Sequence, residues 1–237
     1  MSAVPAPDPG PDAGAVWHHG DPFGEQRAAA DGAVVIDRSH RTVLSLTGPE
    51  RQSWLHNISS QHVSSLPEGS VTQNLSLDGQ GRVEDHWWQT ELAEQTVLDT
   101  EGWRGEALLG FLRKMIFWAD VTVEPADLAV LTLLGPGVAE PEVLAVLGVT
   151  TLPAESTAVA LPGGGFVRRI PGTIPELDVV VPTSHAADLR KRLVAAGVRP
   201  AGVWAYEAHR VIELRPRLGV DTDERTIPHE AGWIGGP

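Results

Sequence analysis

The chain has 237 residues, 42% of them apolar and 21% charged, which is typical of a globular protein with one large or two small domains. Its formal net charge of −13, without a basic cluster, argues against nucleic acid as a partner. The absence of cysteine excludes disulfides, thiolate metal sites and iron–sulfur ligation by this chain. Because the sequence has neither a membrane-length apolar run nor a signal-peptide pattern, we expect a cytoplasmic protein that binds no membrane.

The first predicted element is an extended start without periodic apolar residues. Residues 1–25 contain four prolines in the first eleven positions, so we expect a disordered lead-in. Folded structure is predicted to begin near Gly32, where residues 33–36 have the composition of a short buried strand.

An internal repeat follows. Residues 43–50 (VLSLTGPE) return as residues 130–137 (VLTLLGPG), with five of eight positions identical. Each copy predicts a strand, a Gly-Pro corner and then a helix, over residues 50–56 and 140–147 respectively. A chance match between two strand-to-helix turns is the alternative to duplication.

The later elements favour duplication because they recur in the same order. Each half continues with a hairpin, a strand and an amphipathic helix. In the first half these are residues 71–77 with 82–92, 96–99 and 103–117; in the second they are 157–161 with 166–170, 177–181 and 184–196. A final helix is predicted over residues 202–214. The sequence therefore predicts an α+β fold made of two split-βαβ, ferredoxin-like halves, residues 26–126 and 127–237.

The densest polar and aromatic cluster lies on the strand after the first hairpin turn. Strand alternation predicts Glu84, His86 and Trp88 on one face, with Val83, Asp85 and Trp87 on the other. Such a strand could bind a flat heteroaromatic by stacking and hydrogen bonding. An edge strand with a solvated polar face and core tryptophans explains the pattern equally well.

A second cluster lies in and after the last helix. Glu207 and Arg210 are spaced to form an ion pair within the helix, although the arginine could instead hold a ligand carboxylate. Three tryptophans, Trp54, Trp103 and Trp118, are predicted to pack in the core. No common catalytic or metal-binding signature is present, so we assign no catalytic residue and no metal ligand.

Several motifs resemble the folate-binding YgfZ/GcvT-like family. They are Leu46-Thr47-Gly48-Pro49-Glu50-Arg51, Leu75-x-Leu77-Asp78-x-x-Gly81-Arg82-Val83, Pro216-Arg217-Leu218-Gly219-Val220-Asp221 and Thr226-Ile227-Pro228-His229-Glu230. The resemblance implies an aminomethyltransferase-like fold with tetrahydrofolate in a cleft between the halves. It also implies that the cofactor-binding residues are Asp85, His86, Trp88, Glu207 and Arg210.

The chain departs from the family pattern at the position of an important acid. His86 stands where relatives usually have Asp or Asn, and Ile212 replaces a glutamate that follows Arg210 in the family pattern. The family also continues into a Lys-Gly-Cys-Tyr-x-Gly-Gln-Glu segment and a small β-barrel domain, so we expect this sequence to be truncated.

The resemblance leaves three functional hypotheses. The first is a tetrahydrofolate-binding, YgfZ-like protein that assists iron–sulfur cluster assembly or repair, with iron–sulfur proteins as clients. The second is a folate-dependent aminomethyltransferase similar to the glycine cleavage T-protein. The third is a non-catalytic interaction scaffold.

Overall fold

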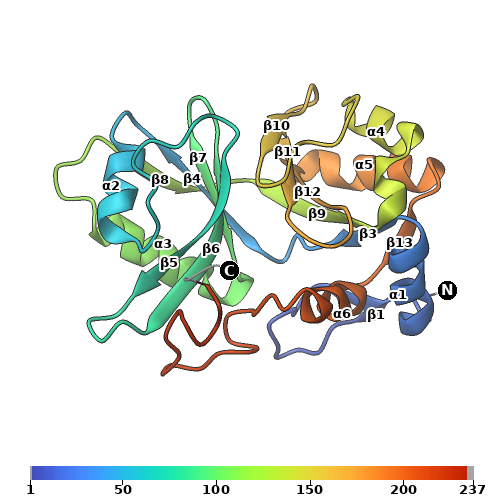
Figure 1. The fold of residues 1–237 in the computed structure, drawn as a ribbon, viewed down its shortest axis with the longest axis horizontal. Helices are drawn as coiled ribbons and strands as arrows, with labels where there is room; N and C mark the ends of the chain where they lie inside the picture. Colours follow the sequence, from blue (N-terminus) through green and yellow to red (C-terminus); the bar gives the residue numbers. More distant parts are fainter. Residues whose placement is uncertain (1, 234–237) are drawn as a thin grey trace. The chain divides into compact units, whose positions relative to one another are not determined.

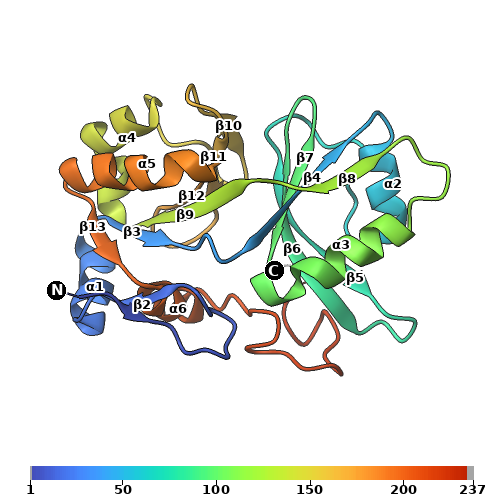
Figure 2. The same ribbon diagram turned by 180° about the vertical axis from the view of Figure 1, so that it is seen from behind.

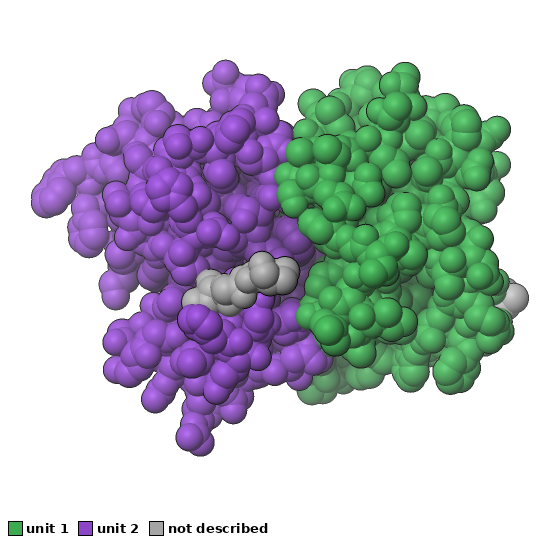
Figure 3. Space-filling model, in the orientation of Figure 1, with its two compact units in different colours: residues 1–40, 127–215 green, residues 41–126, 216–237 purple. Residues whose placement is uncertain are grey.

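The computed structural model describes residues 2–233, and the chain forms two compact units, each built from two separate segments. Unit 1 comprises residues 1–40 and 127–215, and unit 2 comprises residues 41–126 and 216–237 (Figure 3). The chain passes from unit 2 to unit 1 after residue 126. The expected halves differ from the units because each unit also takes a terminal segment. No helix in the described part of the chain has the length and apolar character needed to cross a membrane.

Unit 2 is built on a five-stranded antiparallel sheet (Figure 1). Two helices, α2 (Arg51–Ile58) and α3 (Gly105–Lys114), share one apolar core with the sheet face that carries Leu44, Leu98 and Trp87. The short 3-10 helix η1 (Gly102–Arg104) precedes α3. In spatial order, the strands are β5 (Val71–Leu77), β6 (Val83–Glu91), β7 (Thr96–Thr100), β4 (Thr42–Thr47) and β8 (Thr122–Pro125).

Unit 1 is built on a six-stranded sheet with helices on both faces (Figure 2). One face packs with α4 (Pro141–Leu147) and α5 (Thr183–Ala195), and the other with α1 (Pro22–Asp31) and α6 (Val203–Ile212). In spatial order, the strands are β10 (Ala158–Ala160), β11 (Phe166–Ile170), β12 (Glu176–Pro182), β9 (Leu128–Leu134), β3 (Val34–Asp37) and β13 (Arg199–Ala201).

The two sheets have the same strand order, which supports the duplication inferred from the repeat. The order β5-β6-β7-β4-β8 in unit 2 corresponds to β10-β11-β12-β9-β13 in unit 1, except that β3 is inserted before β13. β3 runs antiparallel to β9 and parallel to β13, so β13 keeps the direction that β8 has relative to β4. The α+β fold class predicted from the sequence is confirmed.

The Gly-Pro corners of the repeat have matching backbone geometry. Gly48 has φ +108° and Gly135 has φ +114°, both in a region that L-residues rarely adopt. A Cβ at Gly48 would lie 2.2 Å from the carbonyl oxygen of Asp120, and one at Gly135 would lie 2.3 Å from that of Gly32. Both positions therefore require glycine for two independent reasons.

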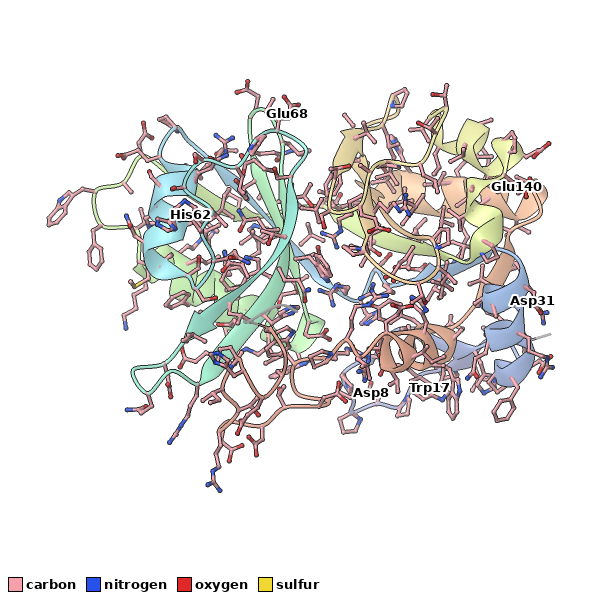
Figure 4. The ribbon with its side chains drawn as sticks, viewed as in Figure 1. Asp8, Trp17, Asp31, His62, Glu68 and Glu140 are labelled. Carbon is pink, nitrogen blue, oxygen red and sulfur yellow. The ribbon has the colours of Figure 1, made fainter. Side chains whose placement is uncertain are left out.

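The N-terminal segment differs from the disordered lead-in expected for residues 1–25. It forms two short antiparallel strands, β1 (Val4–Pro5) and β2 (Val16–His18), followed by the start of α1. Ala6 and Ala15 are buried in the same cluster as the α6 residues Val203 and Tyr206. Trp17 lies beside α6 (Figure 4), with its ring edge-on to Trp204 at a centroid distance of 5.0 Å. Small apolar residues, which carry no helical or strand period, anchor this segment.

Two of the three tryptophans expected in the core are exposed. Trp54 is buried, but Trp103 is 52% exposed and Trp118 is 96% exposed. The expectation failed because the helix predicted over residues 103–117 is shorter. Trp103 lies in η1 before the amphipathic part of α3, and Trp118 lies in the loop after α3 ends at Lys114.

We predict that Gly135→Ala destabilises the protein by at least about 1–3 kcal/mol, because alanine must adopt a strained backbone next to the carbonyl of Gly32. Urea unfolding at neutral pH measures this change. Gly163→Ala is the matched control, since a Cβ there meets nothing within 4 Å, and its effect should stay within about 0.5 kcal/mol. Equal effects of the two substitutions would contradict the interpretation.

Candidate functional site

The candidate ligand-binding face lies on β6, where His86 and Trp88 point to the side of the sheet opposite α2 and α3. Trp87, between them, is fully buried in the helix-covered core. Trp88 lies opposite Gln73 of β5 and Asp99 of β7, so these three residues share the His86 face. Strand alternation in the sequence correctly separated His86 and Trp88 from Trp87.

A register shift near Glu84 alters this alternation toward the start of β6. Ser76 pairs with Asp85, but the next residue of β5, Leu77, pairs with Val83, leaving Glu84 as an extra residue. Val83 consequently packs with Leu75 and Leu218, not on the side of Trp87 as expected. Asp85 keeps the orientation predicted for it.

Asp85 is held in an ion pair on the helix side of the sheet. Its carboxylate accepts a hydrogen bond from Arg104 Nε at 2.8 Å and one from Ser76 Oγ at 3.0 Å. The side chain is almost fully buried, and neighbouring strand residues point to opposite faces. Within unit 2, Asp85 and His86 are therefore adjacent in sequence but face different surroundings.

His86 is a buried imidazole in contact with polar and aromatic groups. Its Nε2 lies 2.8 Å from Gln73 Oε1, and its ring stacks on Trp233 with a centroid distance of 4.7 Å and an interplanar angle of 16°. Burial lowers the pKa of His86 to about 4, and the nearby positive charge of Arg41 acts in the same direction. His86 is therefore neutral at physiological pH and adds no positive charge to this face.

The C-terminal segment of unit 2 runs along this face of β6. The backbone N–H of Val83 donates to the carbonyl of Thr226 at 2.9 Å, Leu218 packs on Leu75, and Trp233 covers His86. A hollow of about 610 Å³ opens at the same end of β6. Its walls include Glu84, Trp103 and Arg104.

Sequence reasoning missed a buried ionic network beside His86. Arg41 donates from Nε to Asp99 at 2.8 Å and from Nη1 to Glu101 at 2.9 Å, while Arg217 donates from Nη2 to Glu101 at 2.7 Å. All four side chains are buried. No local spacing in the sequence could pair Arg217 with Glu101, which lies 116 residues away.

In unit 1, Glu207 and Arg210 pair with each other on α6, as the helical spacing suggested. Arg210 donates to Glu207 Oε2 from Nη2 at 2.6 Å and from Nε at 2.8 Å, and from Nη1 to the Arg215 carbonyl at 3.2 Å. Arg210 is almost fully buried. The structure therefore shows the pair itself, while ligand binding by these two residues stays a prediction.

A second missed cluster joins Glu176, His209 and Arg215 in unit 1. Glu176 Oε2 lies 3.0 Å from His209 Nε2 and 2.5 Å from Arg215 Nη2. Burial raises the pKa of Glu176, but the hydrogen bond from His209 and the charge of Arg215 outweigh it, so its pKa lies below the ordinary value. Glu176 is therefore an anion in the interior of the unit.

The groups on the His86 face are ones that can stack on a ring and form hydrogen bonds with it. Among residues 2–233, no group of three or more histidines or acids is arranged to hold a metal ion. The His86 face instead combines a neutral imidazole, an indole and the Gln73 amide. The Trp233 Nε1–H, which is buried, has no hydrogen-bond partner among the described residues. These groups suit a flat, polar heteroaromatic ring.

The fold is that of an aminomethyltransferase. The solved structure of the glycine cleavage system aminomethyltransferase T from Bartonella henselae matches 96% of this chain with a TM-score of 0.85 and 21% identity, covering 63% of that chain. The heterotetrameric sarcosine oxidase from Corynebacterium sp. U-96 matches 73% of this chain with a TM-score of 0.51 and 18% identity, covering 89% of that chain.

The sequence is similar to curated aminomethyltransferases, although no family model matches it. It is 28% identical over 232 residues to the aminomethyltransferase of Chromobacterium violaceum, covering 91% of this chain and 61% of the relative. It is 29% identical over 230 residues to that of Bordetella avium, covering 90% and 61% respectively. The chain thus spans about three-fifths of the length of these relatives.

We predict that His86 makes the protein acid-sensitive. The unfolded chain binds a proton on this residue below about pH 6.5, whereas the folded protein binds it only near pH 4. Stability contributed by the neutral imidazole is therefore present above pH 6.5 and falls by about 3 kcal/mol as the pH drops to 4. Urea unfolding at several pH values should show a shallower pH dependence for His86→Gln.

The control for this experiment is His62→Gln. His62 lies exposed beside α2 (Figure 4), where its ring meets that of His56. Its substitution should leave the pH dependence between 6.5 and 4 unchanged. A wild-type slope equal to that of His86→Gln would show that other groups cause the acid sensitivity.

Proposed function

We propose that this chain is the folate-binding part of a tetrahydrofolate-dependent protein related to the aminomethyltransferases. The observation that carries the proposal is similarity to those enzymes along nine-tenths of the chain, at 28% identity to the Chromobacterium violaceum protein. The matching fold supports it independently of the aligned residues. The chain covers three-fifths of the length of such relatives. We therefore propose, and do not infer from the similarity alone, that it shares their aminomethyl-transfer activity.

The His86 face of β6 supports a pterin-like ligand. Trp88 and the stacked pair of His86 and Trp233 provide aromatic groups on one side of the sheet, and Gln73 provides an amide that can both donate and accept hydrogen bonds. The neutral state of His86 at physiological pH suits an uncharged heterocycle. Ligand binding by Glu207 and Arg210 of unit 1, which the resemblance implies, is a separate prediction, and in the structure these two side chains bind each other.

Tetrahydrofolate supplies two amine nitrogens that accept and carry a one-carbon unit. In the proposed function, this chain's residues bind and orient the ligand. The imidazole of His86 is neutral and forms a hydrogen bond with Gln73. The ion pair between Arg41 and Asp99 fixes β7, the strand next to β6. Asp85 takes no part in proton transfer in this proposal, because its carboxylate accepts hydrogen bonds from Arg104 and Ser76 on the other side of the sheet.

An accessory role without group transfer is the second candidate. The observation that favours it is the neutral imidazole at position 86, where family resemblance leads us to expect an acid opposite the folate amines. A neutral ring offers no negative charge to stabilise a developing cation. In this role the protein binds tetrahydrofolate and assists iron–sulfur cluster assembly or repair, as in YgfZ-like proteins.

We predict that tetrahydrofolate binds the chain and that Trp88→Leu weakens binding about three- to tenfold, because one aromatic wall of the site is lost. Isothermal titration calorimetry measures the affinity. Trp118→Leu is the matched control, since Trp118 is 96% exposed in a loop and its loss should leave binding unchanged. A folded wild-type protein that gives no heat with tetrahydrofolate would overturn the proposal.

An aminomethyl-transfer assay with tetrahydrofolate separates the two candidates. Transfer by the wild-type chain supports the aminomethyltransferase relation, whereas binding without transfer supports the accessory role. His86→Asp places an acid on the ligand face and should raise any transfer rate, while Asp85→Asn should act through stability alone.

A further inference from the structure

Unit 1 contains a groove whose lining residues all belong to that unit and suit a ligand other than folate. Its volume is about 430 Å³, and it lies where α5 passes the edge of the sheet at β3, β13 and the β2 segment. This volume falls within the range of small-molecule pockets. The groove uses none of the residues of the candidate folate site.

The groove has an apolar floor. Val16 comes from β2, Val35 from β3, Val194 from α5, and Pro200 and Ala201 from β13. Val35 and Pro200 are paired across β3 and β13 and so share the sheet face that α5 covers, and Val194 of α5 is 42% exposed. Proline in the edge strand also removes a backbone donor that another strand would need, which favours a small molecule over an added β-strand.

The rim of the groove is cationic in a chain that is strongly acidic overall. Its lining includes Arg190 and Lys191 of α5 and one carboxylate, Asp37, which accepts a hydrogen bond from Arg190 Nη1 at 3.0 Å. Lys191 is exposed and makes no ion pair with any of the residues that the structure describes. An ammonium group above an apolar floor complements an anion that carries an apolar body.

We propose that this groove binds a small monocarboxylate with an apolar chain, with the carboxylate on Lys191 and the chain against Val35, Val194 and Pro200. The site is separate from the proposed folate function and does not depend on it.

Octanoate is the test ligand, with octylammonium as a probe of the same chain length and opposite charge. Titration of the full chain followed by 15N–1H correlation spectra should show octanoate shifting the amide signals of Val35, Val194 and Ala201. Affinity should rise about fourfold for each methylene added from butyrate to octanoate, as each is buried on the floor. Octylammonium should bind at least tenfold more weakly than octanoate.

Lys191→Glu should weaken octanoate binding about tenfold or more and strengthen octylammonium binding, because it reverses the charge of the rim. Arg192→Glu is the matched control: it makes the same charge change on the next residue of α5, which pairs with Asp188 and lies outside the groove. It should change the octanoate affinity less than twofold. Val194→Trp, which narrows the groove without changing its charge, should also weaken octanoate.

Equal affinities for the two probes would overturn the proposal, since they would indicate apolar adsorption without charge recognition. Equal losses in Lys191→Glu and Arg192→Glu would overturn it as well, because they would show a diffuse effect of protein charge. Circular dichroism of each variant confirms that the fold is retained.

Discussion

Two buried arginines hold the acids behind the His86 face of unit 2. Arg41 joins Asp99 to Glu101, and Arg217 binds Glu101 from the C-terminal segment. Removing one partner from such a buried pair typically costs about 3–5 kcal/mol, because the remaining charge is left without compensation. The network therefore has two consequences at once: it fixes the strand that carries Asp99 next to Trp88, and it anchors the segment that brings Trp233 onto His86.

The two units show how one strand order can carry different chemistry. Both keep the Gly-Pro corner and the same succession of hairpin, strand and helix, so the backbone plan is shared. The polar groups are not shared. In unit 2, Asp99 of β7 and Glu101 just after it bind Arg41, whereas in unit 1 the buried Asp178 of β12 binds Arg168 and Thr132. The two repeats thus share a backbone arrangement, and the side chains that differ between them determine what each sheet can bind.

Much of the fold could be predicted because local sequence patterns determine many of its helices, strands and turns. The repeat, the hairpins and the helix of residues 183–195 follow from spacing and turn chemistry. Local patterns also separated His86 from Trp87. They could not reveal the pairing of Arg217 with Glu101, because these residues are 116 positions apart. They also missed the shift at Glu84 that moves Val83 to the other face, because strict strand alternation does not provide for an extra residue in the hairpin. Trp103 and Trp118 were misplaced because small changes in helix ends decide burial there.

The inserted strand β3 has a consequence for the synthesis of the protein. Val34, Val35 and Ile36 are buried on both faces of the sheet, yet their partners are residues 132–134 and 199–201. As the chain leaves the ribosome, β4 to β8 can pair among themselves while β3 still lacks both neighbours. An unpaired strand of this composition can associate with other chains. We therefore expect β3 to stay without its partners until β9 and β13 have been made, so that slow translation of unit 1 lengthens the time in which this strand can associate with other chains.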